Sequence, residues 1–463
     1  MAHGNRSPAA AGLILVALLL GGCGEKSAPT ARRPSPATGA VVASRASDPP
    51  ASRPSSSGET ALAGELGREM RRAGRASGAY VYDVSAGRAL FAAAPDIART
   101  PASVEKLYTS VAALERLGPS ARFDTTVLGR GSRSADGAWH GDLYLRGGGD
   151  PTFGSPAFNA VYTDGQGALI TTLVSELTGR DGLRRVTGDV YADESLFDSR
   201  RGGPTTGYAA DELDLGGELS ALSYNHGTVV DGARRARGRG RPGPKAALAP
   251  GASAVLRFVE GLRGAHVSAR ATQAAVATPA DATVLARVSS PALPEVLSLM
   301  NRPSDDFYAE MLVKQLGVRT FGVGSLPAGA RAISGVLSQL GVHARVTDGS
   351  GLSRADATTP REVTQTLVAT ARTPLFADLR DSLAVVGRSG TLATRMRHTP
   401  AAGRCQAKTG TLVAVSTLAG YCLNRHGHLL AFSFLLSGQS STLAHRLQDD
   451  MTITLARDDP ARP

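Results

Sequence analysis

The chain has 463 residues, enough for two or three domains, and its 42% hydrophobic and 20% charged residues are an ordinary globular balance. The net charge is +11, and six basic residues alternate with glycine and proline between Arg234 and Lys245. No aromatic residue lies among them, which argues against a surface that stacks nucleic-acid bases. We interpret the run as a solvated loop; attraction to an acidic polymer or a membrane surface is the alternative.

The first residues predict an export signal. Arg6 precedes an apolar run over residues 9–20, which is too short to span a membrane comfortably and ends in small residues. The Leu-Gly-Gly-Cys sequence at residues 20–23 resembles a bacterial lipobox, in which cleavage leaves a lipid-modified cysteine. Residues 1–23 are therefore expected to be a lipoprotein signal peptide with Cys23 as the lipidated residue. An ordinary signal peptide is the alternative.

Residues 24–58 are rich in proline, serine and alanine and have no periodic apolar pattern, which predicts a disordered tether. A first part of the folded chain is expected over residues 59–121. Its predicted elements are a helix at 62–70, a hairpin of strands at 79–84 and 89–92, and a helix at 104–117.

The pattern changes over residues 122–290, where short strands and glycine-rich turns predominate. We interpret this stretch as an inserted, strand-rich domain or pair of domains. A second part of the first domain is then expected over residues 291–463. Its predicted helices lie at 293–300, 305–316, 360–372 and 443–455, and its strands at 406–408 with 412–413, 415–423 and 429–436.

The first chemical motif is Ser103-Val104-Glu105-Lys106, which places Ser103 at the start of a predicted helix. Residues three apart share a helix face, so the Lys106 amine can reach the Ser103 hydroxyl. Serine becomes a good nucleophile when a base removes its proton. Burial and the helix N-terminus both favour the neutral amine that can act as this base. The Ser-x-x-Lys pattern often arises by chance, so it indicates a catalytic pair only together with further motifs.

The second motif is Lys408-Thr409-Gly410-Thr411, on a predicted strand. A cation and a hydroxyl at a strand edge can hold a substrate carboxylate, while Gly410 lets the substrate backbone approach. The backbone N–H groups of Thr411 and Ser103 can form an oxyanion hole.

The third motif is Ser304-Asp305-Asp306, at the start of a predicted helix. Its simplest interpretation is a helix N-terminus, with Ser304 as the N-cap and two acidic residues in the first turn.

The order Ser-x-x-Lys, Ser-Asp-x, Lys-Thr-Gly is the signature of penicillin-binding proteins and serine β-lactamases. The flanking residues make the chain similar to the D-Ala-D-Ala carboxypeptidase/endopeptidase family, the low-molecular-mass class C penicillin-binding proteins. The resemblance covers nearly all of the folded chain. It is carried by residues 101–103, 141–152, 348–353 and 407–412.

The resemblance implies an α+β fold of the penicillin-binding-protein and β-lactamase type, with a large insertion. It implies that Ser103 attacks the carbonyl between two D-alanines of a peptidoglycan stem peptide and that Lys106 takes the serine's proton. Ser304 would relay a proton to the leaving amine, and Lys408 and Thr409 would hold the terminal carboxylate. Water would then cleave the acyl-enzyme. β-Lactams would acylate the same serine, and no metal or organic cofactor is needed.

One residue departs from the family pattern, because Asp306 stands where the family has asparagine. An asparagine amide both donates and accepts, whereas an ionised aspartate only accepts. Asp306 can pair with Lys106 or Lys408, and pairing with Lys106 would favour the charged amine and weaken it as a base. Reduced turnover or altered β-lactam affinity is expected. Residues 223–225, Ser-Tyr-Asn, have the family spacing but fall in the inserted region and are rejected.

Cys405 and Cys422 form an even pair once Cys23 is set aside, and in an oxidising compartment such a pair is a disulfide candidate. A bridge would clamp the Lys-Thr-Gly strand to its neighbour beside the active site. Two buried free thiols are the alternative.

Two other functions stay open. A β-lactamase is disfavoured by the long insertion and by the lack of a clear deacylating Glu motif. A non-catalytic cell-wall-binding lipoprotein would make Asp306 a sign of decay, but the retained Ser103, Lys106 and Lys408 favour an enzyme. The expected location is the cell envelope, where a lipid on Cys23 would hold the protein at the membrane beside its peptidoglycan substrate.

Overall fold

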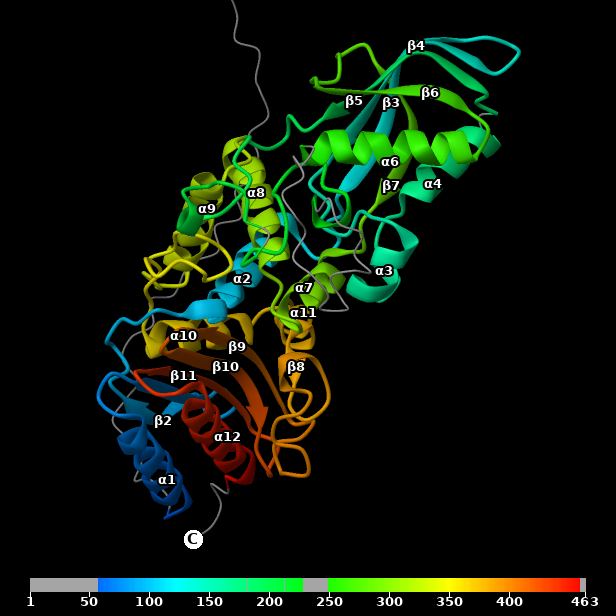
Figure 1. The fold of residues 1–463 in the computed structure, drawn as a ribbon. Coiled ribbons are helices and arrows are strands. Elements are labelled where there is room, and N and C mark those ends of the chain that lie inside the picture. The colour runs from blue at the N-terminus through cyan, green and yellow to red at the C-terminus, as the bar shows by residue number, and fades with distance from the viewer. Residues whose placement is uncertain (1–56, 181, 212, 228–248, 459–463) are drawn as a thin grey trace, which may run out of the picture. The chain divides into compact units, whose positions relative to one another are not determined.

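The computed structural model describes residues 57–180, 182–211, 213–227 and 249–458 (Figure 1). Within these ranges, two β-sheets organise the chain, and three hydrophobic cores pack around them. The expected signal peptide, most of the tether and the basic run at residues 234–245 lie outside the described residues.

The larger sheet has the strand order β2-β1-β11-β10-β9-β8, and all of its pairings are antiparallel. Its strands are β1 (Gly78–Asp83), β2 (Arg88–Ala93), β8 (Ala384–Val385), β9 (Cys405–Leu412), β10 (Val415–Leu423) and β11 (Leu429–Ser437). Nearly every residue of β10 and β11 is buried, so this sheet is covered on both faces. Strands from both ends of the described chain thus form one sheet, with the rest of the chain between them.

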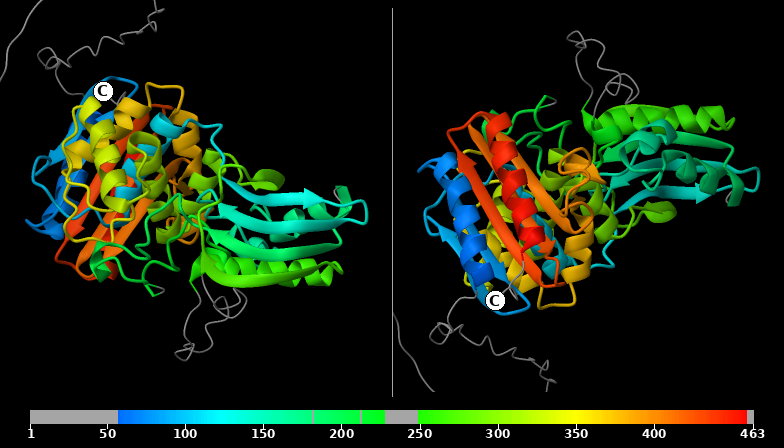
Figure 2. Two further views of the ribbon diagram at one scale, coloured as in Figure 1. Left: turned by 90° about the horizontal axis from the view of Figure 1, so that it is seen from above. Right: turned by 90° about the horizontal axis from the view of Figure 1, so that it is seen from below.

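Helices cover the two faces of this sheet. Two helices, α1 (Ser57–Ala73) and α12 (Ser441–Arg457), lie side by side on one face, as Figure 2 shows. On the other face, α10 (Pro360–Thr370) packs on β1, β10 and β11. The hydrophobic core on this side also includes α2 (Lys106–Leu117), α7 (Leu293–Asn301), α8 (Asp306–Phe321), α9 (Leu326–Gln339) and α11 (Phe376–Ser382). Successive strand residues point to opposite faces, so Leu418 packs with α1 and α12 while Ala419 packs with the other helices.

Local capping explains where several helices begin. The side chains of Ser325 and Ser440 accept N–H groups in the first turns of α9 and α12. Thr359 and Glu362 form a reciprocal capping box at the start of α10, with Pro360 in its first turn. These caps satisfy N–H groups that the helices themselves leave without acceptors.

The smaller sheet has the order β6-β5-β4-β3-β7, with β5 parallel to both of its neighbours. Its strands are β3 (Asp124–Arg133), β4 (Ala138–Gly147), β5 (Arg185–Asp193), β6 (Ser268–Ala275) and β7 (Thr283–Ser289). The strand-rich texture of this region agrees with the sequence. Its helices α3 (Pro156–Tyr162), α4 (Ile170–Ser175) and α6 (Pro250–Gly264) were not anticipated; α6 packs Val255 and Phe258 into the same core as the strands.

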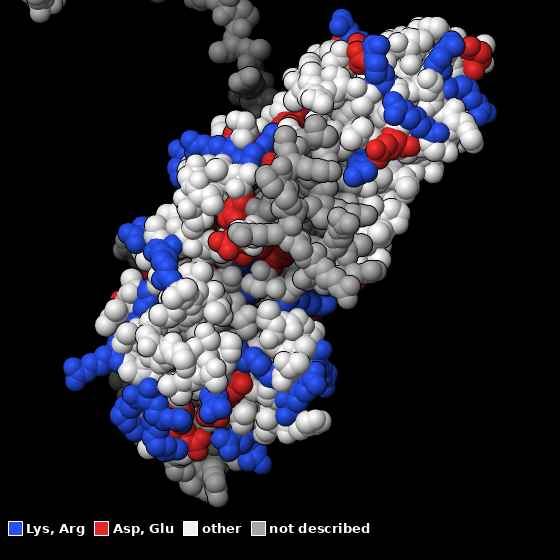
Figure 3. Space-filling view, viewed as in Figure 1, with Lys and Arg blue, Asp and Glu red and all other residues white. Residues whose placement is uncertain are grey.

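Two features of the described residues bear on possible partners. On the face drawn in Figure 3, the described Lys and Arg side chains are scattered and interrupted by Asp and Glu, so the visible surface has no continuous basic stripe. None of the described helices combines the length and the apolar character that crossing a membrane requires.

Candidate active site

Ser103 lies in a short 3₁₀ turn, Ala102–Glu105, which precedes α2. The sequence predicted an α-helix from residue 104, and this start is two residues too early. Ala102 has a φ of 47°, so the backbone turns sharply between Pro101 and Ser103. The Thr417 hydroxyl on β10 donates to the Pro101 carbonyl at 2.7 Å, which fixes the turn to the sheet.

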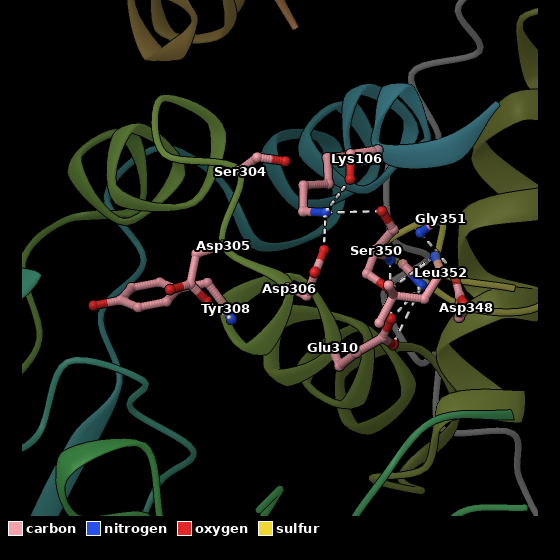
Figure 4. A network of polar contacts seen from close by, with 12 residues as sticks. Lys106, Ser304, Asp305, Asp306, Tyr308, Glu310, Asp348, Ser350, Gly351 and Leu352 are labelled. Atoms are coloured by element: carbon pink, nitrogen blue, oxygen red, sulfur yellow. Dashed lines mark hydrogen bonds and ion pairs between the residues drawn. The ribbon is translucent and has the colours of Figure 1, made fainter. Parts of the chain in front are cut away.

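Lys106 is completely buried, and its amine has three partners (Figure 4). The Nζ atom lies 3.1 Å from Ser103 Oγ, 2.5 Å from Asp306 Oδ1 and 2.8 Å from the Ser350 carbonyl oxygen. The predicted contact between Lys106 and Ser103 is therefore present. Of the two pairings open to Asp306, the structure has the one with Lys106.

Ser304, the serine of the second motif, does not cap α8. Asp305, not Ser304, is the N-cap of α8, because its Oδ1 accepts the Tyr308 N–H at 3.1 Å. The prediction of Ser304 as the cap is wrong, since its φ of 66° takes it out of the extended conformation of an N-cap residue. Its hydroxyl instead accepts a hydrogen bond from Lys408 Nζ at 2.7 Å.

Lys408 is also completely buried, and its amine donates to Ser304 Oγ and to the Thr409 carbonyl, each at 2.7 Å. Burial lowers the pKa of Lys408 well below its usual value; the nearby Lys106 charge lowers it further, and Asp306 opposes the shift. The site thus contains two serine hydroxyls, each in contact with a buried lysine.

Strand β9 lies directly against the Ser103 turn (Ala102–Glu105). A Cβ atom added to Gly410 would come within 2.8 Å of Ser103 N and 2.2 Å of Thr417 Oγ1, so only glycine fits at this position. Thr411 follows Gly410 on the same strand. On the other side of Gly410, Thr409 Oγ1 lies 2.8 Å from the hydroxyl of Thr391.

A disulfide joins Cys405 and Cys422, which are directly opposite each other on β9 and β10 with their Cα atoms 4.0 Å apart. Both residues are completely buried. The bridge links the beginning of the Lys-Thr-Gly strand to the neighbouring strand.

The family model for the D-Ala-D-Ala carboxypeptidase 3 (S13) family matches residues 67–229 and 225–458. The chain belongs to this family. The D-alanyl-D-alanine carboxypeptidase of Actinomadura sp. (strain R39) is 31% identical to it over 453 residues, with 83% of this chain and 81% of the relative covered. Carboxypeptidase DacB of Mycolicibacterium smegmatis is 30% identical, with 78% and 76% covered.

The fold of this S13 family member is shared by penicillin binding protein 4 (dacB) from Haemophilus influenzae. The TM-score is 0.66 at 20% sequence identity, and the match covers 84% of this chain and 98% of that one. A predatory peptidoglycan endopeptidase from Bdellovibrio bacteriovorus matches with a TM-score of 0.51 at 17% identity and covers 82% and 92%. The expected family and the α+β penicillin-binding-protein fold are thereby confirmed.

Several residues around the site were not singled out from the sequence. Ser350 contacts Lys106 through a backbone carbonyl, which no side-chain motif can reveal. Thr391 lies in a short 3₁₀ turn 18 residues before Thr409, and Thr417 contacts the Ser103 turn from β10. A glycine-flanked serine at residues 348–353 was a usable signal for the loop but not for its contact.

Buried carboxyl groups predict that this S13 family member is less stable at neutral than at mildly acidic pH. Burial raises the pKa of Asp150 to about 7, and burial together with the Asp348 charge raises those of Glu310 and Asp356. Such groups bind more protons in the folded than in the unfolded chain, so the free energy of unfolding falls as pH rises between the two pKa values. Lys408 has the opposite effect at alkaline pH, because its folded pKa is lowered.

Urea unfolding between about pH 5 and about pH 7 should therefore show falling stability, with up to about 1.4 kcal/mol per pH unit from each group. The control is Asp150→Asn, which keeps an oxygen for the Thr152 N–H that Asp150 Oδ1 accepts at 2.8 Å. This variant should have a shallower dependence. A variant with the same slope as wild type would contradict the assignment to Asp150.

Proposed function

We propose that this protein is a serine-type D-alanyl-D-alanine carboxypeptidase that cleaves peptidoglycan stem peptides through an acyl-enzyme on Ser103. The observation that carries the proposal is the 3.1 Å contact between Lys106 Nζ and Ser103 Oγ. A serine beside a buried amine is a nucleophile beside its base. Membership of the family and the printed function of the Actinomadura relative support D-alanyl-D-alanine as the substrate.

In the acylation step, Ser103 Oγ bonds to the carbonyl carbon between the two D-alanines, and Lys106 takes the hydroxyl proton. The backbone N–H groups of Ser103 and Thr411 stabilise the developing oxyanion, which the close approach of Gly410 to Ser103 N supports. The C–N bond then breaks. The leaving D-alanine amine receives a proton through Ser304, whose hydroxyl accepts a hydrogen bond from Lys408.

In the deacylation step, water attacks the ester, the acyl group leaves as a shortened stem peptide, and Ser103 regains its proton.

Lys408 and Thr409 bind the terminal carboxylate of the substrate before cleavage. The Thr409 hydroxyl, which lies against Thr391, is the expected hydrogen-bond donor to this carboxylate. The same site binds β-lactams, and the Haemophilus influenzae structural neighbour in complex with a novel β-lactam supports this assignment.

We propose that the protein acts in the cell envelope. Residues 1–23 act as a lipoprotein signal peptide, the lipid on Cys23 anchors the chain, and residues 24–58 form the tether. The peptidase domain comprises residues 59–121 and 291–463, and residues 122–290 are its insertion. The division is supported by the larger sheet, in which β1 and β11 pair although the smaller sheet lies between them in sequence.

The test is release of D-alanine from a synthetic stem peptide that ends in D-Ala-D-Ala, with the matched peptide ending in D-Ala-L-Ala as the control. We expect release from the first peptide only. Binding to the first peptide without release would instead favour a non-catalytic cell-wall-binding lipoprotein. Rapid turnover of a chromogenic cephalosporin without release of D-alanine would favour a β-lactamase.

A further inference from the structure

Four buried carboxyl side chains lie in or near the Ser103 turn, and none of them has a role in the proposed mechanism. Each of the four residues is at most 1% exposed. They are Glu105, Glu310, Asp348 and Asp356. Two of them, Glu310 and Asp348, surround the loop that contains Ser350, as Figure 4 shows.

Glu310 binds the N–H side of this loop. Its Oε1 accepts the N–H groups of Gly349 and Ser350 at 3.1 and 2.9 Å, and its Oε2 lies 3.2 Å from the Gly349 nitrogen. Glu310 lies one helical turn after Asp306 on α8, so both side chains project from the same helix face.

The carbonyl side of the same loop faces α2. The Ser350 carbonyl accepts from Lys106 Nζ at 2.8 Å, and the Gly349 carbonyl accepts from the Thr109 hydroxyl at 2.8 Å. Peptide groups between the two sides thus connect the Glu310 carboxyl to the Lys106 amine. A shift of the loop would change the position of the Lys106 acceptor.

The rest of the loop is held equally tightly. Asp348 accepts the N–H groups of Gly351 and Ser353 at 2.7 and 2.8 Å. Gly351 has a φ of 81°, and a Cβ atom there would come within 2.0 Å of the Ala102 carbonyl oxygen. The loop therefore packs on the backbone of the Ser103 turn itself.

We propose that Glu310 is a positioning residue for the catalytic base, because it fixes the Gly349–Ser350 backbone that holds the Lys106 amine against Ser103. Helix α8 then supplies both of the other contacts of Lys106, one directly through Asp306 and one indirectly through Glu310. This inference rests on the proposed roles of Ser103 and Lys106.

Three charged groups act on Glu310. Asp348 of the loop raises its pKa, and Glu105 of the Ser103 turn and Lys314, one turn further along α8, also interact with it. Burial raises the pKa of Glu105 well above its usual value, with Asp356, Asp348 and Glu310 adding to the shift. The protonation of the cluster therefore changes with pH, and a pH profile reports on it.

The experiment measures the rate of acylation by a fluorescent penicillin, per active site, as a function of pH in wild type, Glu310→Ala and Glu310→Gln. We expect Glu310→Ala to lower the maximal rate about tenfold or more, because a misplaced base costs such factors. Its pH profile should also differ from that of wild type, because the substitution removes one titrating group of the buried carboxyl cluster. Glu310→Gln keeps one oxygen for the loop N–H groups and should remain within about threefold of wild type.

The matched control is Asp193→Ala, which removes another buried carboxyl that holds a loop, by accepting the Ser195 and Thr278 N–H groups at 3.0 and 2.8 Å in the smaller-sheet region. It should lower the unfolding temperature without changing the rate or pH profile per active site. A folded Glu310→Ala variant with the wild-type rate and profile would overturn the inference. Absence of label on wild type would instead overturn the proposed function.

Discussion

The variant Ser103→Ala is expected to lose all covalent labelling by a fluorescent penicillin while it keeps its fold. The substitution removes only the hydroxyl that would form the acyl bond. Lys106 retains its contacts with Asp306 and the Ser350 carbonyl, so its amine stays in place. Removal of a catalytic nucleophile commonly costs several orders of magnitude in rate, which puts the residual label below detection.

Two serine variants serve as controls for this result. Ser304→Ala retains the nucleophile and should label more slowly, because the proton relay next to Lys408 is lost. Ser223→Ala changes the Ser-Tyr-Asn sequence of the insertion, where the hydroxyl donates to the Ser220 carbonyl at 3.1 Å, and should label like wild type. Persistent label on Ser103→Ala, or loss of label on Ser223→Ala, would show that the nucleophile or the second motif is misassigned.

The variant Asp306→Asn is expected to be acylated about tenfold faster than wild type near neutral pH, which corresponds to about 1.4 kcal/mol in the activation free energy. The Asp306 carboxylate lies 2.5 Å from Lys106 Nζ and forms an ion pair with the amine. A charged amine cannot take the Ser103 proton. Asparagine keeps the size and one acceptor oxygen but removes the negative charge, so the ion pair that opposes proton transfer to the amine is lost.

A neighbouring variant distinguishes this explanation from a general change in packing. The neighbouring variant Asp305→Asn is the control, because Asp305 caps α8 at the Tyr308 N–H, whereas Asp306 forms the ion pair with Lys106. It should not accelerate acylation. If wild type is acylated as fast as Asp306→Asn, the prediction is wrong.

The contact between Ser103 and Lys106 could be predicted from the sequence because it lies within a short local pattern. Ser103 and Lys106 are three residues apart, so one helical turn is enough to bring them together. The pairing of Cys405 with Cys422 followed from the two strands that carry them, which form a tight hairpin. The family resemblance then gave the fold, which the comparisons confirmed.

The features that were missed depend on contacts between distant parts of the chain. Asp306 had two possible lysine partners, and the choice of Lys106 depends on how α8 approaches α2. The cap of α8 moved from Ser304 to Asp305 because a tertiary contact with Lys408 holds the Ser304 side chain. Nothing in the sequence around Glu310 predicts its hydrogen bond to the distant Gly349 N–H group.

The pairing of β1 with β11 has a consequence for the order in which the molecule becomes active. Gly78 of β1 is matched with Leu435 of β11, so a very long loop must close before the larger sheet is complete. Strands β9 and β10, which hold the Ser103 turn, belong to the same late-closing sheet. During synthesis from the N-terminus, the Ser103 turn therefore lacks its contacts with Gly410 and Thr417 until the last third of the chain has been made and folded.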